Sequence, residues 1–155
     1  MDYNNIENKI INVLKNTFVC TLATANKSGV VSTAQMSLVS DGLIVYLQTD
    51  GAFNKVKNIT ENPNIAINCG AYNFKGVAKI VGHPKTNKKF LELIKNKHLK
   101  TYENYTLLLN EVLIEITLTE CKIWDIDSSK NTNKKTITIV NFLNKSVNIK
   151  TCDKM

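Results

Sequence analysis

The sequence contains no arginine: its 20 basic residues are all lysine, set against 13 acidic ones. The net charge of +7 invites a nucleic-acid interpretation. Arginine, however, binds phosphates and guanine edges with a planar fork, whereas lysine supplies only a flexible point charge. The lysines are also scattered, apart from short clusters such as Lys88-Lys89. We therefore expect no specific nucleic-acid partner.

Cysteine is sparse, with four residues far apart and no C-x-x-C pair. Cys20, Cys69 and Cys121 each lie in an apolar run, where a free cysteine behaves as a small buried hydrophobe. The two histidines, His83 and His98, have no acidic or cysteine neighbour at ligand spacing. We expect free thiols ahead of disulfides, and no metal site.

Long hydrophobic runs are missing as well. No apolar run approaches the roughly 18 residues that span a bilayer, and residues 1–5 lack the basic end and apolar stretch of a signal peptide. These absences predict a cytoplasmic protein with no membrane partner. At 155 residues, 43% of them hydrophobic, the chain suits one domain whose core needs no disulfide or metal.

The motifs of self-sufficient catalytic sites are also missing. The chain has no G-x-S-x-G, H-E-x-x-H, G-x-G-x-x-G or Walker sequence. Glu111 and Glu115 would share a face of a helix, but the alternation of their segment predicts a strand. We expect both carboxylates on a solvated strand face, so the catalytic residues stay unassigned.

Strand patterns outnumber helix patterns. Alternating runs and turn residues predict strands over 18–24, 30–38, 43–49, 64–70, 76–82, 111–119 and 121–126. Helical spacing predicts helices over 3–16 and 52–60 and a third that starts at Thr86, with Phe90, Leu91, Leu93 and Ile94 on its inner face. Since the parallel βαβ rhythm is absent, we expect an antiparallel barrel with added helices.

Residues 48–55 have the character of an anion site. A strand ends at Thr49, Gly51 turns the chain, and a short helix begins with Lys55 in its first turn. Free amides and the positive end of the helix dipole attract anions to such a helix start. Lys55 adds a full charge, and Thr49 and Asn54 offer hydrogen-bonding groups. The pattern suits one phosphate group, although a lysine in this position can also be merely solvated.

Several features follow one another in a set order. They are the apolar run 18–24, Gly29 after a polar turn, the hairpin through Asp41-Gly42, Thr49 with Lys55 six residues later, Asn58, Pro63 and, further on, Lys122-Ile123-Trp124. With them, the chain from about Phe18 to Asp127 resembles the FMN-binding split barrel of the pyridoxamine 5′-phosphate oxidase-like superfamily. The resemblance implies a mainly β fold with added helices, an antiparallel Greek-key split β-barrel.

The resemblance also implies FMN as the cofactor and a homodimer that binds two FMN molecules in clefts between its subunits. The implied cofactor-binding residues are Thr33, Ala34, Gln35 and Met36 along the isoalloxazine, Gln48 and Thr49 beside the ribityl chain and ring, and Asn54 and Lys55 on the phosphate. Trp124 would either pack near a flavin, that of the partner subunit included, or serve as a core or interface aromatic.

Two departures from the family pattern limit what it implies. Members that oxidise pyridoxamine 5′-phosphate use arginines on the phosphates of cofactor and substrate, and this chain has none. Asn54 stands where an arginine often precedes the lysine, and Val77 replaces a polar residue on a later strand. We expect weaker cofactor binding and no vitamin B6 oxidation.

The resemblance thus implies an FMN-binding flavoprotein, an oxidoreductase acting on a small molecule, of the nitroimidazole-reductase or stress-protein type. The alternatives are a non-catalytic FMN- or haem-binding carrier or sensor, and a dimeric fold remnant with an empty cleft. Residues 1–127 would form the FMN-binding split-barrel domain. Residues 128–155 would extend it with a polar linker over 128–135 and a hairpin of 136–141 with 146–150.

Overall fold

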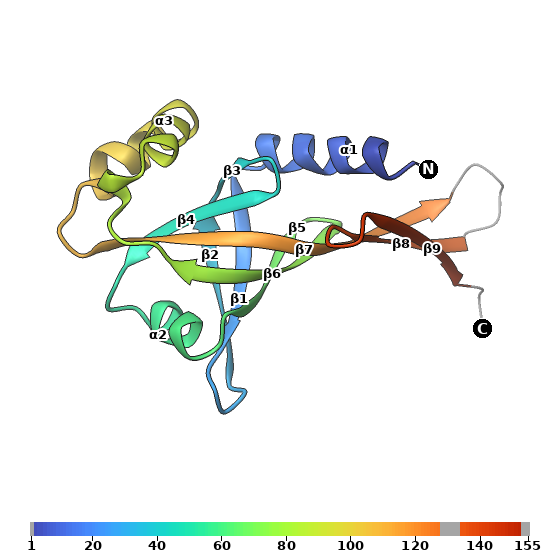
Figure 1. The fold of residues 1–155 in the computed structure, drawn as a ribbon, viewed down its shortest axis with the longest axis horizontal. Coiled ribbons are helices and arrows are strands. Elements are labelled where there is room, and N and C mark those ends of the chain that lie inside the picture. Colours follow the sequence, from blue (N-terminus) through green and yellow to red (C-terminus); the bar gives the residue numbers. More distant parts are fainter. Residues whose placement is uncertain (1, 128–133, 153–155) are drawn as a thin grey trace.

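A curled antiparallel sheet forms the body of the chain (Figure 1). The computed structural model describes residues 2–127 and 134–152. The strands are β1 (Val19–Ala25), β2 (Val31–Ser37), β3 (Val39–Asp41), β4 (Ile44–Asp50), β5 (Asn64–Cys69), β6 (Tyr72–Ile80), β7 (Glu111–Asp127), β8 (Lys134–Asn141) and β9 (Ser146–Cys152). The helices are α1 (Tyr3–Asn16), α2 (Asn54–Glu61), α3 (Lys88–Lys97) and α4 (Leu99–Thr101), with short helical turns η1 (Pro84–Thr86) and η2 (Tyr102–Thr106).

The strands lie in the order β2-β1-β5-β6-β7-β4-β3, and β8 and β9 are added along the far half of β7. The chain crosses from β2 at one edge to β3 and β4 at the other, and then returns through α2 to β5 beside β1. This crossing is the Greek-key order. The sheet curls until β2 contacts β4. The prediction of a mainly β, antiparallel Greek-key split β-barrel is confirmed.

The barrel core follows from the alternation of apolar side chains along the strands. Helix α1 packs Ile6, Ile10 and Leu14 against this core, and Asp2 accepts a hydrogen bond from the Asn4 backbone N–H at 3.2 Å at its start. The helix therefore has the predicted bounds. A second, smaller cluster lies under α3 and consists of Val39, Tyr46, Phe90, Ile94 and Leu113.

One long strand, β7, replaces the two strands predicted over 111–119 and 121–126. The register against β6 shifts between Lys75 and Gly76, so Thr119 is an extra residue on β7 and the pairing continues past it. Gly76 is required there, because a Cβ at this position would lie 2.9 Å from the Thr117 carbonyl oxygen. A β-bulge of this kind lets a strand run on with a local twist.

Other boundaries differ from the sequence prediction at the ends of elements. The predicted strand 30–38 ends at Ser37, and the chain continues as β3 after Leu38; β6 begins earlier than predicted, at Tyr72. Helix α3 begins at Lys88 rather than Thr86, because Asn87 accepts the Phe90 backbone N–H at 2.9 Å and caps it. Of its predicted inner face, Phe90 and Ile94 are buried and Leu91 and Leu93 are half-buried. The turns α4 and η2 were not predicted.

The predicted C-terminal hairpin is present as β8 and β9, and Figure 1 shows it extending away from the barrel, at the end of β7 remote from α3. Strand β8 begins at Lys134, inside the predicted linker 128–135, and the rest of that linker lies outside the described residues.

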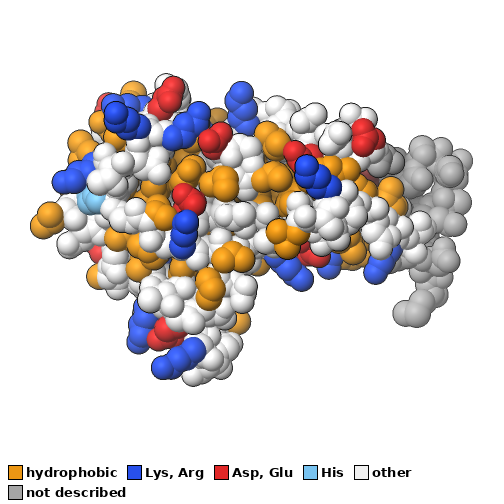
Figure 2. All heavy atoms as spheres, in the orientation of Figure 1, with side chains coloured by type: hydrophobic (Ala, Val, Ile, Leu, Met, Phe, Trp, Pro, Cys, Tyr) orange, Lys and Arg blue, Asp and Glu red, His pale blue; other side chains and the backbone are white. Residues whose placement is uncertain are grey.

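Within the described ranges, the prediction of free thiols is confirmed for Cys20, Cys69 and Cys121, which are buried and unpaired. Across residues 2–127 and 134–152, no three histidine, cysteine or acidic side chains come together to hold a metal ion. None of the helices described is long and apolar enough to cross a membrane. On the face shown in Figure 2, lysines are interspersed with acidic side chains and form no continuous basic patch.

Candidate cofactor site

An open groove of about 450 Å³ lies where β2, β4 and the start of α2 meet α4, η2 and the start of β7. Its lining residues are Gln35, Met36, Ser37, Gln48, Thr49, Asp50, Phe53, Lys55, Thr101, Tyr105, Leu108 and Glu111. The volume is within the range of small-molecule sites, and a mixture of apolar walls and a few polar groups is typical of them. We name it the β2–β4 groove.

Lys55 is the only basic residue among those that line the groove. Its Nζ donates a hydrogen bond to Thr49 Oγ1 at 3.2 Å and lies 4.7 Å from the centroid of the Phe53 ring. Burial lowers the pKa of Lys55, and the nearby Glu111 carboxylate opposes that shift. The ammonium is therefore held within the groove by the end of β4.

Helix α2 begins beside the groove without a side-chain cap. Phe53 is the N-cap residue and supplies no side-chain hydrogen bond. Asp50 Oδ1 accepts from the Ala52 N–H at 2.8 Å, which tightens the turn that precedes the helix. Helix amides without intrahelical partners, together with an adjacent ammonium, form an anion site.

The opposite wall of the groove is an edge strand. Among the described strands, β2 pairs with β1 alone. Backbone N–H and C=O groups along the outer side of an edge strand are free to bind a ligand. Gln35 and Ser37 from this strand line the groove, so a planar heterocycle placed there would meet a row of donors and acceptors.

Gln48 forms a polar side wall of the groove, and a buried hydroxyl group holds its amide in place. Thr106, fully buried in η2, donates from its Oγ1 to Gln48 Oε1 at 2.8 Å. This bond uses the acceptor of the Gln48 amide and leaves its Nε2 group as a donor at the groove.

Two carboxyl groups also line the groove, and neither belongs to the predicted cofactor-binding residues. Asp50 and Glu111 are direct cross-strand partners on β4 and β7. Glu111 is only 7% exposed, and its Oε2 is buried without a hydrogen-bond partner. The expectation of a solvated strand face is therefore wrong for Glu111. Glu115, four residues further along β7, lies 3.6 Å from Lys79 in an ion pair.

A signal for this burial was present in the sequence at Leu113. It falls on the same side of β7 as Glu111 and Glu115, and it is fully buried beneath α3. An apolar side chain between the two glutamates indicates that this side of β7 is covered by other parts of the chain near the start of the strand, and not exposed to solvent.

The groove brings together five of the nine cofactor-binding residues predicted from the sequence: Gln35, Met36, Gln48, Thr49 and Lys55. Thr33 and Ala34 precede them on β2 without lining it. Asn54 lies on the other side of α2, in a separate hollow that also contains Lys57 and Asn58.

Trp124 is remote from the groove of its own chain. It is 47% exposed and lies 13 residues beyond Glu111 on β7, roughly 40 Å along an extended strand. It pairs there with Ile137 of β8. Contact between Trp124 and a flavin therefore stays a prediction that requires a second chain.

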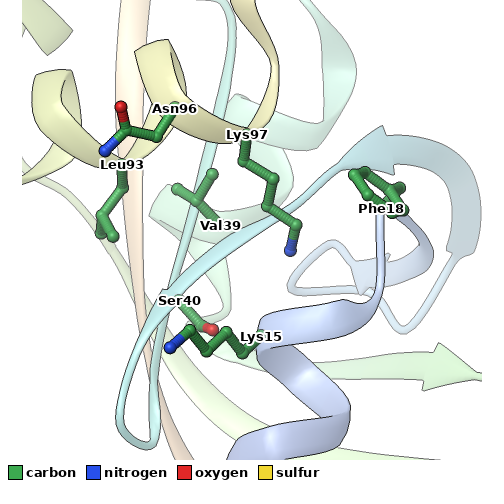
Figure 3. A pocket seen from close by; sticks show the side chains of 7 residues that line it. All are labelled: Lys15, Phe18, Val39, Ser40, Leu93, Asn96 and Lys97. Carbon is green, nitrogen blue, oxygen red and sulfur yellow. The ribbon is translucent and has the colours of Figure 1, made fainter.

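A second hollow, of about 350 Å³, lies between the end of α1, β3 and the end of α3 (Figure 3). The side chains of Lys15 and Lys97 extend toward it from the two helices. The Lys97 ammonium already donates to the Leu14 carbonyl oxygen at 3.2 Å and lies 5.6 Å from the Phe18 ring. Lys97 therefore ties α3 to α1, and the residues predicted to bind a cofactor are not found here.

A third hollow, of about 420 Å³, lies on the outer face of β1, β2, β5 and β6 and is lined mainly by small and apolar side chains. Val31 and Val77 belong to it and are 66% and 45% exposed. Val77 therefore lies outside the β2–β4 groove, so its apolar character does not alter the groove lining.

Three solved structures illustrate the fold that this chain shares. ChuZ from Campylobacter jejuni is 12% identical, with 99% of this chain and 64% of that chain covered and a TM-score of 0.71. A pyridoxamine 5′-phosphate oxidase-related, FMN-binding protein from Nostoc punctiforme is 10% identical, with 98% and 93% covered and a TM-score of 0.60. The haem storage protein HutZ from Vibrio cholerae is 14% identical, with 76% and 91% covered and a TM-score of 0.59.

At these identities the structures show a common fold alone. No curated protein matches the sequence. The family model described as pyridoxamine 5′-phosphate oxidase matches residues 6–125, which include the barrel strands from β1 to most of β7 and every residue of the groove. The chain therefore belongs to the pyridoxamine 5′-phosphate oxidase family.

Proposed function

We propose that the chain is an FMN-binding flavoprotein that acts as an oxidoreductase on a small molecule. The observation that carries the proposal is the Lys55 ammonium, held 3.2 Å from Thr49 Oγ1 at the start of α2, within a groove whose opposite wall is the free edge of β2. An FMN-binding relative from Nostoc punctiforme has the same fold.

The residues of the groove fit the parts of FMN. Lys55 and the first amides of α2 would hold the phosphate, and the Gln48 Nε2 group would donate to the ribityl chain or ring. The outer edge of β2 would bind the polar edge of the isoalloxazine, with Gln35 and Met36 beside it. Bound FMN would supply the electron transfer, while these residues bind and orient it.

The alternative of a haem-binding carrier requires an axial ligand, and histidine is a common one. Both histidines of this chain already make hydrogen bonds. His83 lies with Nε2 2.7 Å from the Leu108 carbonyl oxygen and accepts the Lys85 N–H at Nδ1, and His98 Nε2 lies 3.0 Å from the Leu38 carbonyl oxygen. His83 thus has both ring nitrogens engaged, and neither histidine is among the residues that line the β2–β4 groove, which favours FMN there over the haem stored by HutZ.

We propose further that a second copy of the chain closes the groove. Val31 of the apolar third hollow and Gln35 of the groove point to the same side of β2, four residues apart, which is roughly 13 Å. A partner seated on the apolar hollow would therefore lie beside the groove and would shield a flavin on its open side. Trp124 of the partner subunit is the aromatic residue predicted to meet that flavin.

The test is reconstitution of the apoprotein with FMN, followed by turnover with NAD(P)H and an artificial electron acceptor. The proposal expects stoichiometric FMN uptake and acceptor reduction that depends on it. FMN uptake without turnover would support the non-catalytic carrier or sensor instead. Failure to take up FMN would indicate a fold remnant with an empty cleft.

A further inference from the structure

The charge balance of the β2–β4 groove opposes the binding of a phosphate while both of its carboxyl groups are ionised. The charged residues that line it are Lys55, Asp50 and Glu111. With both acids ionised, the groove carries one net negative charge. A phosphate monoester adds a charge of about −1.5 to −2 near neutral pH. One ammonium does not balance all three groups, so loss of the charge on one of the two carboxyl groups would favour binding.

The structure indicates that this carboxyl is Glu111. Asp50 has a hydrogen-bond partner for its carboxyl group, since its Oδ1 accepts the Ala52 N–H at 2.8 Å. Glu111, in contrast, has a buried Oε2 without a partner, and no ion pair within 4.0 Å is found for it in the described part of the chain. A buried carboxylate oxygen that lacks hydrogen bonds is costly, whereas the protonated form is less so.

The surroundings of Glu111 act in the same direction. The carboxyl of Asp50 faces it from β4, Lys55 faces it from α2, and His83 faces it from the segment before η1. Burial is the largest influence and raises the pKa of Glu111, and the Asp50 carboxylate raises it further; His83 and Lys55 lower it. An incoming phosphate would add a second negative neighbour beside Lys55.

From this geometry we propose that Glu111 determines which ligands the groove accepts: it admits a phosphate as a neutral carboxylic acid and repels it as a carboxylate. This inference rests on the proposed binding of FMN at Lys55. Binding of FMN is then accompanied by uptake of one proton at Glu111, whose O–H becomes available as a hydrogen-bond donor. The groove prefers a phosphate at mildly acidic pH and discriminates against it at alkaline pH.

The sign of the pH dependence follows from linkage. A bound phosphate raises the pKa of Glu111 above its value in the free protein, so the complex holds more protons than the apoprotein. Affinity is therefore greatest below the pKa of the free protein and falls as the pH rises through the pKa of the complex. The phosphate of FMN itself titrates near pH 6. Its second ionisation strengthens the attraction to Lys55 as the pH rises, which is opposite to the effect of Glu111. A comparison of two proteins at the same pH cancels that effect.

The experiment is fluorescence titration of apoprotein with FMN and with riboflavin, between about pH 5 and about pH 8, for the wild type and Glu111→Gln. Glutamine keeps the shape of the side chain and cannot ionise. The ratio of the FMN Kd of the wild type to that of the variant should rise from near one at the acidic end to about tenfold or more at the alkaline end. With riboflavin, which lacks the phosphate, the ratio should stay near one throughout.

Two further variants make the result decisive. Glu115→Gln removes a carboxylate from the same side of β7 that is already paired with Lys79 at 3.6 Å, and it should leave both constants unchanged. Lys55→Ala, measured in parallel, tests the underlying proposal separately. If Lys55→Ala weakens FMN binding but the ratio for Glu111→Gln is flat with pH or falls, the inference about Glu111 is overturned and the FMN site stands. If Lys55→Ala has no effect, the phosphate site itself is wrong.

Discussion

Removal of the Lys55 ammonium is the sharpest perturbation of the proposed phosphate site. Lys55 is half-buried, and its Nζ contacts Thr49 Oγ1 at 3.2 Å beside the first turn of α2, which has no side-chain cap. A charge-assisted hydrogen bond contributes about 1.5–3 kcal/mol. We therefore expect Lys55→Ala to weaken FMN binding about ten- to a hundredfold. Fluorescence titration of the apoprotein measures the change.

Lys57 provides the matched control. It lies two residues further along α2, about 200° around the helix axis, and it lines the separate hollow next to Asn54. Lys57→Ala removes the same charge from the same helix and should have little effect. Riboflavin binding should be nearly indifferent to both changes. Equal losses for the two variants, or equal losses for FMN and riboflavin, would refute the placement of the phosphate at Lys55.

Four other outcomes are expected. The pure protein should not convert pyridoxamine 5′-phosphate to pyridoxal phosphate in a spectrophotometric assay, because lysine lacks the bidentate fork that fixes a substrate phosphate; efficient conversion would contradict this. Sedimentation should show a flavin-bound dimer, which Val31→Glu weakens, and a flavin-bound monomer near 17.4 kDa would contradict the closed groove. Burial raises the pKa of Cys20 and Cys121 to about 12 and that of Cys69 to about 11. In a Cys152→Ser variant, a thiol reagent at neutral pH should therefore label these residues only after unfolding, and rapid labelling of the native protein would contradict their burial. Because the pKa of Glu111 is raised, its ionisation costs stability above the usual glutamate range. Glu111→Gln should thus raise the melting temperature of the apoprotein at neutral pH. The gain should disappear as the pH falls below the usual glutamate range, where both states of the wild type are protonated. An unchanged melting temperature at neutral pH would count against the cost of ionising Glu111.

Most of the fold could be predicted from local patterns. The spacing of Ile6, Ile10 and Leu14 predicts α1 with its observed bounds, and alternation predicts most of the strands. The errors arise where tertiary structure overrides a local signal. The bulge opposite Gly76 joins two predicted strands into β7, because the extra residue Thr119 is accommodated by a register shift that no local pattern encodes.

The candidate site could be predicted in part. Residues 48–55 carry a local anion-site pattern, and the structure places Thr49 and Lys55 in contact as that pattern suggests. The remainder depends on pairing between distant segments. Glu111 enters the groove only because β7 pairs with β4, and Asn54 leaves it because of its position around α2. The closing partner involves a second chain, which a single sequence does not describe.

The visible absorbance spectrum of the purified protein, with identification of the chromophore released on denaturation, tests the central proposal most directly. We predict the spectrum of an oxidised flavin, which bleaches on reduction with dithionite, and FMN as the released molecule. Protein that is isolated without flavin should acquire the same spectrum when it is incubated with FMN and then freed of excess. The absorbance of a haem protein, or a protein that stays colourless after incubation with FMN, would contradict the account.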